Sequence, residues 1–189
     1  MIRDLWYNNL QKKFNYFLSH HFSEVRPMIQ YVRENYNGGL VGVELGVRNG
    51  TNAKNILRIL PNIKTLYLID IWKDYSQDGV SYDHSDGYDK TKRNLSKYNG
   101  KILLIKGTLS EANIPDNFFD FMYVDSNHSR EWVKKDLGGG YSKIKSGGVI
   151  GGHDFTGNHL GVIEAVLEFA TKNDVELFTR HPDWWMVKS

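Results

Sequence analysis

Two acidic residues and two histidines in the second half of the chain have side chains that can promote reaction of a hydroxyl group. They are Asp125 and His128, three residues apart, and the adjacent pair His153 and Asp154. A divalent ion lowers the pKa of a hydroxyl group and fixes its oxygen, and a neutral imidazole can accept a proton near neutral pH. We therefore predict two catalytic residues, His128 as general base and Asp125, and a metal site at Asp125, His153 and Asp154.

The type of ligand indicates which ion this site would hold. Carboxylate oxygens such as those of Asp125 and Asp154 suit magnesium or calcium-like ions, whereas His153 would be better tolerated by manganese. Aspartate is also a common helix cap, so a purely structural role is the alternative for both acids.

A turn that contains two glycines follows the first predicted strand, in the sequence Glu-Leu-Gly-Val-Arg-Asn-Gly-Thr of residues 44–51. Glycine lets a ligand approach the backbone at such a strand-to-helix turn. The G-x-G-x-x-G fingerprint of dinucleotide-binding proteins is missing, and Glu44 would repel a pyrophosphate. The turn therefore favours a cationic ligand, such as a sulfonium or an amino group, over a nicotinamide dinucleotide. A purely structural turn is the alternative.

Two further strand ends could bind a nucleoside. Asp70 closes the second predicted strand about twenty residues beyond the glycine turn, where an acid can hold ribose hydroxyls. Ile71 and Trp72 follow it, and Trp72 could stack on an adenine or pack in the core. After the third strand, Thr108 and Ser110 flank Leu109 and could contact an adenine edge or cap a helix.

Alternating strands and helices must position these residues. Short apolar runs predict strands over 40–45, 65–71, 102–105, 118–124 and 149–150, and helical periodicity is found over 51–60, 88–98, 130–143 and 159–172. Such alternation predicts an α/β fold with a doubly wound, mostly parallel sheet that binds ligands beyond the carboxyl ends of its strands. Residues 175–178 and 184–187 could add two edge strands as a hairpin, and the polar segment 73–89 is a lid or a decorative loop.

Composition indicates one soluble domain over residues 1–189, with N-terminal helices over 1–39 and a catalytic core over 40–189. The N-terminal helices are predicted over 6–17 and 22–36, and they could cap the sheet, cover the site or form a dimer interface. The net charge of +2 gives no indication of a nucleic-acid or membrane partner, and the chain has no cysteine for a disulfide or thiolate chemistry. No signal peptide or membrane helix is apparent, so we expect a cytoplasmic protein.

Four segments in order carry a resemblance to a known family. They are Glu44-Leu45-Gly46 with Gly50, Ile69-Asp70-Ile71-Trp72, the run from Phe119 to His128 and the run from Lys145 to Asp154. With this spacing the chain resembles class I S-adenosylmethionine-dependent methyltransferases. It is most similar to the branch with macrocin-type and rhamnosyl sugar O-methyltransferases and proteins labelled cephalosporin hydroxylase. The resemblance implies a Rossmann-like, seven-stranded sheet with an antiparallel last strand.

The resemblance also implies roles for single residues. Glu44 and Gly46 would contact the methionine part of S-adenosylmethionine, and Asp70 its ribose. Asp125 and acids near His153 and Asp154 would bind Mg²⁺ or a similar ion, and His128 would be the base. Relatives often carry a second carboxylate at the position of His153, which weakens the metal prediction. The residues predicted to bind the cofactor are Glu44, Gly46, Arg48, Asn49, Gly50, Thr51, Asp70, Ile71, Trp72, Thr108, Leu109, Ser110 and Asp125.

The predicted reaction is methyl transfer from S-adenosylmethionine to a hydroxyl group of a small molecule or glycan, with a sugar favoured and Mg²⁺ or Mn²⁺ assisting. The alternatives are a metal-independent methyltransferase for a phenolic or other acceptor, a nicotinamide-binding oxidoreductase, and a cofactor-binding module without catalysis. A homo-oligomer is left open, and the five other histidines are expected to have surface roles: His20, His21, His84, His159 and His181.

Overall fold

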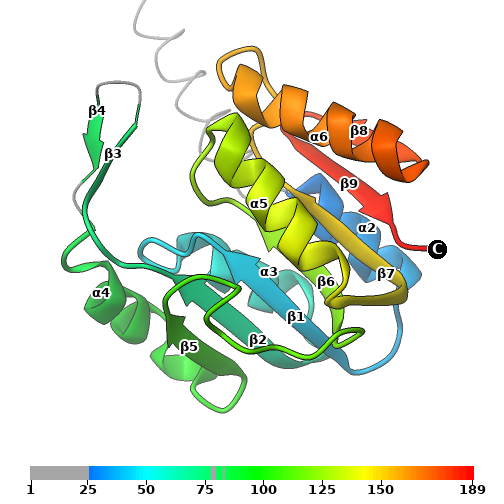
Figure 1. Cartoon of the computed structure of the whole chain (residues 1–189). Helices are drawn as coiled ribbons and strands as arrows, with labels where there is room; N and C mark the ends of the chain where they lie inside the picture. Colours follow the sequence, from blue (N-terminus) through cyan, green and yellow to red (C-terminus); the bar gives the residue numbers. More distant parts are fainter. Residues whose placement is uncertain (1–25, 78–79, 83) are drawn as a thin grey trace, which may run out of the picture.

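The computed structural model describes residues 26–77, 80–82 and 84–189 (Figure 1). The helix predicted over 6–17 lies outside these ranges, as does the start of the one predicted over 22–36. The rest of the second helix is α2 (Pro27–Asn35). Proline in the first turn suits a helix start, because its ring fixes φ and its missing N–H would have no partner there.

A seven-stranded sheet forms the centre of the molecule, and its parallel part confirms the predicted fold class (Figure 1). In spatial order its strands are β5 (Ile102–Lys106), β2 (Ile63–Asp70), β1 (Leu40–Leu45), β6 (Phe119–Val124), β7 (Ile144–Gly152), β9 (Asp183–Val187) and β8 (Leu177–Arg180). Only β9 runs against its neighbours; the other strands share one direction. The chain order of the strands reverses between β1 and β6, and this reversal is where such sheets bind ligands.

Helices cover both faces of the sheet, which explains why its central strands β1 and β6 are largely apolar and buried (Figure 1). On one face, α2 and α3 (Thr51–Ile59) enclose a core with residues such as Ile56 and Phe121. On the other face, α5 (Arg130–Tyr141) and α6 (Leu160–Asn173) enclose a second core around Met122 and Val166. No helix within the described ranges is long and apolar enough to cross a membrane.

The C-terminal hairpin differs in one respect from the sequence expectation of two edge strands. Strand β9 pairs with β7 on one side and β8 on the other, so only β8 lies at that edge of the sheet. Strand β7 is also longer than the predicted run over 149–150, because its first half is the polar sequence Lys-Ser-Gly-Gly at 145–148, which has no apolar signal. The hairpin itself was predicted correctly.

The polar segment 73–89 contains a separate two-stranded unit, β3 (Tyr75–Gln77) and β4 (Val80–Tyr82), followed by α4 (Gly87–Asn94). Helix α4 and the short 3-10 helix η1 (Ser96–Tyr98) replace the single helix predicted over 88–98. The backbone N–H of His84 donates to the Asp74 carboxylate at 2.8 Å, which fixes the end of the segment close to the sheet.

Candidate active site

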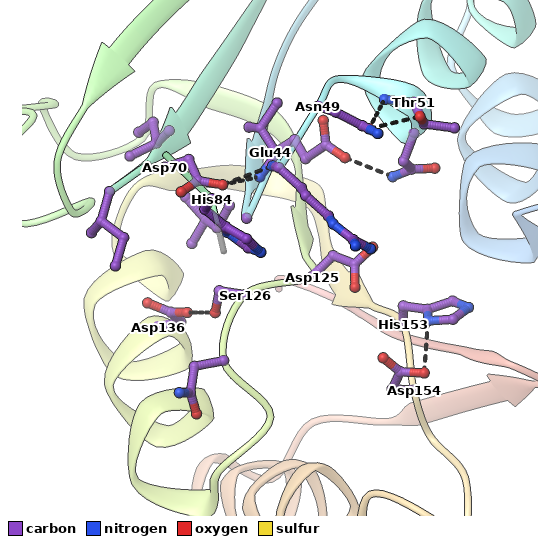
Figure 2. A pocket seen from close by; sticks show the side chains of 18 of the residues that line it. Glu44, Asn49, Thr51, Asp70, His84, Asp125, Ser126, Asp136, His153 and Asp154 are labelled. Atoms are coloured by element: carbon purple, nitrogen blue, oxygen red, sulfur yellow. Dashed lines mark hydrogen bonds and ion pairs between the residues drawn. The ribbon is translucent and has the colours of Figure 1, made fainter. Parts of the chain in front are cut away.

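A cavity of about 1020 Å³ opens at the carboxyl ends of β1, β2, β6 and β7 (Figure 2). This volume is at the upper end of the range for small-molecule sites, roughly 300–1,000 Å³. Most of the predicted site residues line it: Glu44, Gly46, Arg48, Asn49, Thr51, Asp70, Ile71, Thr108, Leu109, Asp125, His128, His153 and Asp154. The sheet topology therefore brings strand ends that are far apart in the sequence into one site.

The Asp70 carboxylate fixes the glycine turn. Its Oδ2 accepts hydrogen bonds from the backbone N–H groups of Val47 and Arg48, both at 2.8 Å, and its Oδ1 accepts from Trp72 N–H at 2.7 Å. A carboxylate has about four acceptor positions, so a hydroxyl group could still bind. Ribose binding by Asp70 stays a prediction, and the structure adds a positioning role that the sequence did not indicate.

Glycine is required at position 46 because the turn passes directly over the end of β6. Gly46 has a φ of +84°, and a Cβ atom built there would clash with the carbonyl oxygen of Asp125. The Asp125 N–H donates to the carbonyl of Leu45 at 2.8 Å. The turn and the first acid of the predicted metal site are therefore held together by backbone contacts.

Glu44 is fully buried at the end of β1 and lines the cavity. Its Oε1 accepts from the Asn52 amide at 2.8 Å, and its Oε2 has no hydrogen-bond partner among the described residues. Burial raises the pKa of Glu44 to about 8. A buried carboxyl oxygen without a partner is costly, and a positively charged ligand group would satisfy it.

The predicted adenine contact of Trp72 is wrong, and the core-packing alternative is the correct one. The side chain is 2% exposed, its Nε1–H donates to the Arg48 carbonyl at 2.9 Å, and its ring packs edge-on against Tyr88. Gly50 and Ser110 are not among the residues that line the cavity. Gly50, with a φ of +79°, instead serves the turn before α3.

The hydroxyl residues after β5 form a local turn rather than a helix cap. Thr108 donates from its backbone N–H at 2.7 Å and from its Oγ1 at 2.8 Å to the same carboxylate oxygen of Glu111. Thr108 and Leu109 remain at the cavity wall, while the Ser110 hydroxyl lies 3.0 Å from that of Thr108. An adenine contact by Thr108 and Leu109 stays a prediction.

Asp125, His153 and Asp154 come together as the sequence predicted. One ligand atom from each lies within 4.8 Å of the other two, and His153 Nδ1 is 2.9 Å from Asp154 Oδ1 (Figure 2). Asp154 has a left-handed backbone, with a φ of +62°. The N-cap residues of the helices that follow the two acids are Ser129 for α5 and His159 for α6, and neither helix has a side-chain cap hydrogen bond, which argues against the helix-cap alternative.

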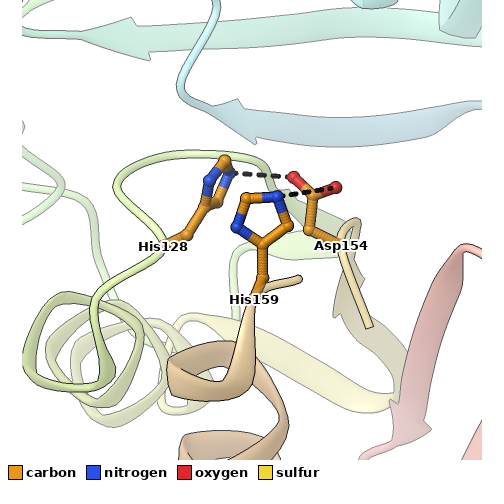
Figure 3. Close-up of side chains that lie close together, drawn as sticks. All are labelled: His128, Asp154 and His159. Carbon is orange, nitrogen blue, oxygen red and sulfur yellow. Dashed lines mark ion pairs between the residues drawn. The ribbon is translucent and has the colours of Figure 1, made fainter. Parts of the chain in front are cut away.

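His128 and His159 approach the same aspartate from another side (Figure 3). His128 Nε2 is 3.0 Å from Asp154 Oδ2, His159 Nε2 is 3.8 Å from Asp154 Oδ1, and the two imidazole ring centres are 4.5 Å apart. His159 directly precedes α6 and was expected to have a surface role. The structure places it in the cluster instead, where the three side chains could also hold a metal ion.

The pKa of His128 differs from the sequence expectation of a neutral imidazole near pH 7. Burial lowers this pKa, but hydrogen bonds and charge from Asp125 and Asp154 outweigh burial and raise it to about 9. For Asp154 the two effects have the opposite sign. Burial raises the pKa of this carboxyl group, but hydrogen bonds and charge from His128 and His153 lower it by more, so the pKa lies below its usual value. Without an added cation, His128 and Asp154 form an ion pair at neutral pH.

The cavity is also lined by residues that the sequence analysis did not assign to the site, among them Arg26, Asp136 and His84. Arg26 lines the cavity directly before α2, and Asp136 lines it from α5, where its carboxylate accepts a hydrogen bond from the Ser126 hydroxyl. Burial raises the pKa of Asp136. His84, expected at the surface, is 8% exposed and also lines the cavity. The sequence does not indicate these positions, because Asp136 is one of several polar residues in its predicted helix and His84 lies in a polar loop.

A family model described as a methyltransferase domain matches residues 43–155. The match covers more than half of the chain and extends from β1 to just beyond Asp154. Together with the sheet topology and the cavity at its switch point, it defines the class of protein. The chain belongs to this methyltransferase family, for which S-adenosylmethionine is the expected methyl donor. A search of curated proteins gives no match.

Solved structures of other methyltransferases share the fold. The O-methyltransferase NovP is 19% identical, with a TM-score of 0.61, and the alignment covers 86% of this chain and 79% of that one. Precorrin-6y C5,15-methyltransferase from Geobacter metallireducens is 12% identical, with a TM-score of 0.58, and 85% and 84% are covered. The tRNA (m1A58) methyltransferase TrmI from Aquifex aeolicus is 15% identical, with a TM-score of 0.57, and 87% and 70% are covered. At these identities the likeness establishes the fold, which serves different acceptors.

Proposed function

We propose that this chain transfers a methyl group from S-adenosylmethionine to a hydroxyl oxygen of a small molecule or glycan, with a sugar as the favoured acceptor. The main observation is that the cluster of Asp125, His128, His153 and Asp154 shares one cavity with the buried Glu44 carboxyl. The motif resemblance to sugar O-methyltransferases and the fold shared with an O-methyltransferase support an oxygen acceptor.

Glu44 fits the positively charged end of the cofactor. Its unpartnered Oε2 needs a donor, and the methionine amino group offers up to three N–H donors and a positive charge. The carboxylate of Asp70, which holds the turn, lies at the cavity wall of the next strand end. We therefore assign the methionine part of the cofactor to the end of β1 and its ribose to the end of β2.

The chemistry is a single displacement in line. The acceptor oxygen forms a bond to the methyl carbon while the bond from that carbon to sulfur breaks, so the sulfonium becomes a neutral thioether. The proton of the acceptor hydroxyl goes to His128. Holding the oxygen and the methyl group in line supplies much of the rate enhancement, because positioning replaces a bimolecular encounter.

The residues for a divalent cation are Asp125, His153 and Asp154, a mixed oxygen and nitrogen set that suits Mg²⁺ or Mn²⁺. When bound there, the cation would supply positive charge that orients and acidifies a hydroxyl group. The positive charge of the cation would also partly cancel the negative charge of Asp125 and Asp154, and would therefore lower the His128 pKa. His128 could then be neutral, and able to accept a proton, at lower pH.

Cofactor binding is the first test of this proposal. Calorimetric titration of the purified chain with S-adenosylhomocysteine, the product form of the cofactor, should give saturable binding with a Kd in the micromolar range, on the order of −8 kcal/mol. NADH is the matched control and should give neither heat nor a change in its fluorescence. Heat with NADH alone would revive the oxidoreductase alternative and refute the methyltransferase proposal.

Metal dependence is tested separately with a panel of sugars, phenols and peptides as acceptors. We expect EDTA to reduce methyl transfer by at least about tenfold, and Mg²⁺ or Mn²⁺ to restore it. Added metal should also shift the acid limb of the pH–rate profile to lower pH, because His128 would lose its proton more easily. Full activity in EDTA would remove the ion from the mechanism and favour the metal-independent alternative.

A further inference from the structure

Arg26 lies beside Glu44 at the methionine end of the cavity. Its Nε donates to Asn52 Oδ1 at 3.0 Å, and the amide nitrogen of Asn52 donates to Glu44 Oε1 at 2.8 Å. One asparagine therefore connects the guanidinium group to the buried carboxyl group. Both side chains line the cavity.

The C-terminal hairpin holds the segment that carries Arg26. The first residue of β9, Asp183, is buried, and its Oδ2 accepts from the backbone N–H of Met28 at 3.1 Å. Its Oδ1 accepts from the Tyr123 hydroxyl at 2.9 Å, and the Arg26 guanidinium carbon is 6.0 Å from the centre of the Tyr123 ring. Met28 belongs to the first turn of α2, so the position of Arg26 is fixed by contacts to β6 and β9.

Arg26 differs from the other cations at the cavity. Arg48, Lys54 and Arg58 also line it, but their side chains are exposed, whereas Arg26 is partly buried. Burial lowers the pKa of Arg26, but Tyr123 and the acids Asp125, Asp183 and Glu44 more than compensate and raise it. The guanidinium group is therefore charged under all ordinary conditions, and water screens it less than the exposed cations.

We propose that Arg26 binds the α-carboxylate of the methionine part of S-adenosylmethionine. The inference rests on the proposed cofactor site and assigns a residue that lies outside the family match over 43–155. The amino and carboxylate groups of an α-amino acid are attached to the same carbon. A site that takes the amino group at Glu44 must therefore accommodate the carboxylate close by. The planar guanidinium group suits a carboxylate because it can donate two parallel hydrogen bonds.

The test uses two ligands that differ only in this carboxylate. S-Adenosylmethionine and decarboxylated S-adenosylmethionine share the adenosine, the sulfonium and an amino group. In the Arg26→Met variant, we expect the Kd for S-adenosylmethionine to rise by about 10- to 100-fold, since a hydrogen bond between charged groups is lost. The Kd for the decarboxylated ligand should change by less than about threefold. Arg26→Lys should recover part of the affinity for S-adenosylmethionine, because lysine restores the positive charge but cannot donate two parallel hydrogen bonds to the carboxylate.

Arg33→Met is the matched control, because Arg33 is an exposed arginine on the same helix and is not among the cavity-lining residues. It should bind both ligands as the wild type does. Equal losses for both ligands in Arg26→Met would show that Arg26 is merely structural and would overturn the inference. If that variant does not fold, Arg26→Lys decides: a larger loss for S-adenosylmethionine than for the decarboxylated ligand supports the inference, and equal losses overturn it. Absence of binding of either ligand to the wild type would instead refute the cofactor proposal.

Discussion

Replacing His128 with alanine is expected to lower the turnover number by about 10²- to 10⁴-fold while the affinity for the cofactor stays within about twofold. His128 Nε2 is 3.0 Å from Asp154 Oδ2 and 3.8 Å from Asp125 Oδ1 (Figure 3 shows the pair with Asp154), and no hydrogen bond joins it to Glu44 among the described contacts. The variant removes the imidazole that takes the proton of the substrate hydroxyl group, and it leaves the contacts to the methionine part of the cofactor intact. Turnover at saturating cofactor and the Kd for S-adenosylhomocysteine measure the two effects separately.

The pH dependence gives a second readout for His128. A base acts only when it is deprotonated, so a pKa of about 9 in the metal-free site predicts that activity in EDTA rises with pH up to about 9. The His128→Ala variant should lose this acid limb. His181→Ala is the control, because His181 is exposed and is not among the cavity-lining residues, and it should behave as the wild type. Equal losses of turnover and cofactor affinity in His128→Ala would contradict its role as a base.

Replacing Glu44 with glutamine is expected to stabilise the ligand-free protein at about pH 8 and to weaken cofactor binding there by about 100-fold. The pKa of about 8 keeps Glu44 protonated in the folded protein up to about pH 8, whereas in the unfolded chain the proton leaves near the ordinary pKa of 4.5. The stability that the protonated, buried group contributes is therefore full below pH 4.5 and is lost as pH rises toward 8. Glutamine resembles the protonated form and avoids that loss, which is on the order of 5 kcal/mol for a shift from 4.5 to about 8.

Thermal unfolding as a function of pH, combined with titration of S-adenosylhomocysteine, checks both parts of this prediction. Between about pH 5 and 8 the variant should lose less stability than the wild type. Glu176→Gln removes an exposed carboxylate and should change neither stability nor affinity. A Glu44→Gln variant that binds the cofactor as tightly as the wild type would contradict the assignment of the amino group to Glu44.

The positions of the strand ends could be predicted because each carries two kinds of local information. Apolar runs such as Leu40 to Leu45 are buried on both faces, and the residue that follows is glycine or a polar side chain. Parallel topology then places all these ends at one edge of the sheet, so Glu44, Asp125 and Asp154 could be assigned to one site without coordinates.

The direction of a side chain at a strand end could not be predicted, because it depends on tertiary contacts. Trp72 turns into the core because the Arg48 carbonyl accepts its N–H and Tyr88 packs against its ring. His159 approaches Asp154 to 3.8 Å, and Asp154 has a left-handed backbone that its residue type does not indicate. The raised pKa of His128 likewise depends on contacts with Asp125 and Asp154. Residue types alone do not show these contacts, so the sequence predicted an ordinary imidazole pKa for His128.

Sequence analysis also could not predict that Arg26 and Asp183 come close together, because neither residue lies near a recognisable motif. They are separated by most of the chain, and their meeting depends on β9 entering the sheet between β7 and β8. A sequence pattern that describes local periodicity cannot show such a contact. Only the path of the tail through the sheet brings Asp183 to Met28, in the segment that follows Arg26.

The internal position of β9 has a consequence for synthesis on the ribosome. Arg26 and the glycine turn are translated early, but Asp183, which anchors α2 through Met28, is translated after nearly all of the sheet. A nascent chain that stops before β9 lacks a strand between β7 and β8 and the anchor for α2. We therefore expect the growing chain to gain tight cofactor affinity only after β9 has left the exit tunnel and paired with β7, so that the ligand would select chains that contain β9 over shorter ones.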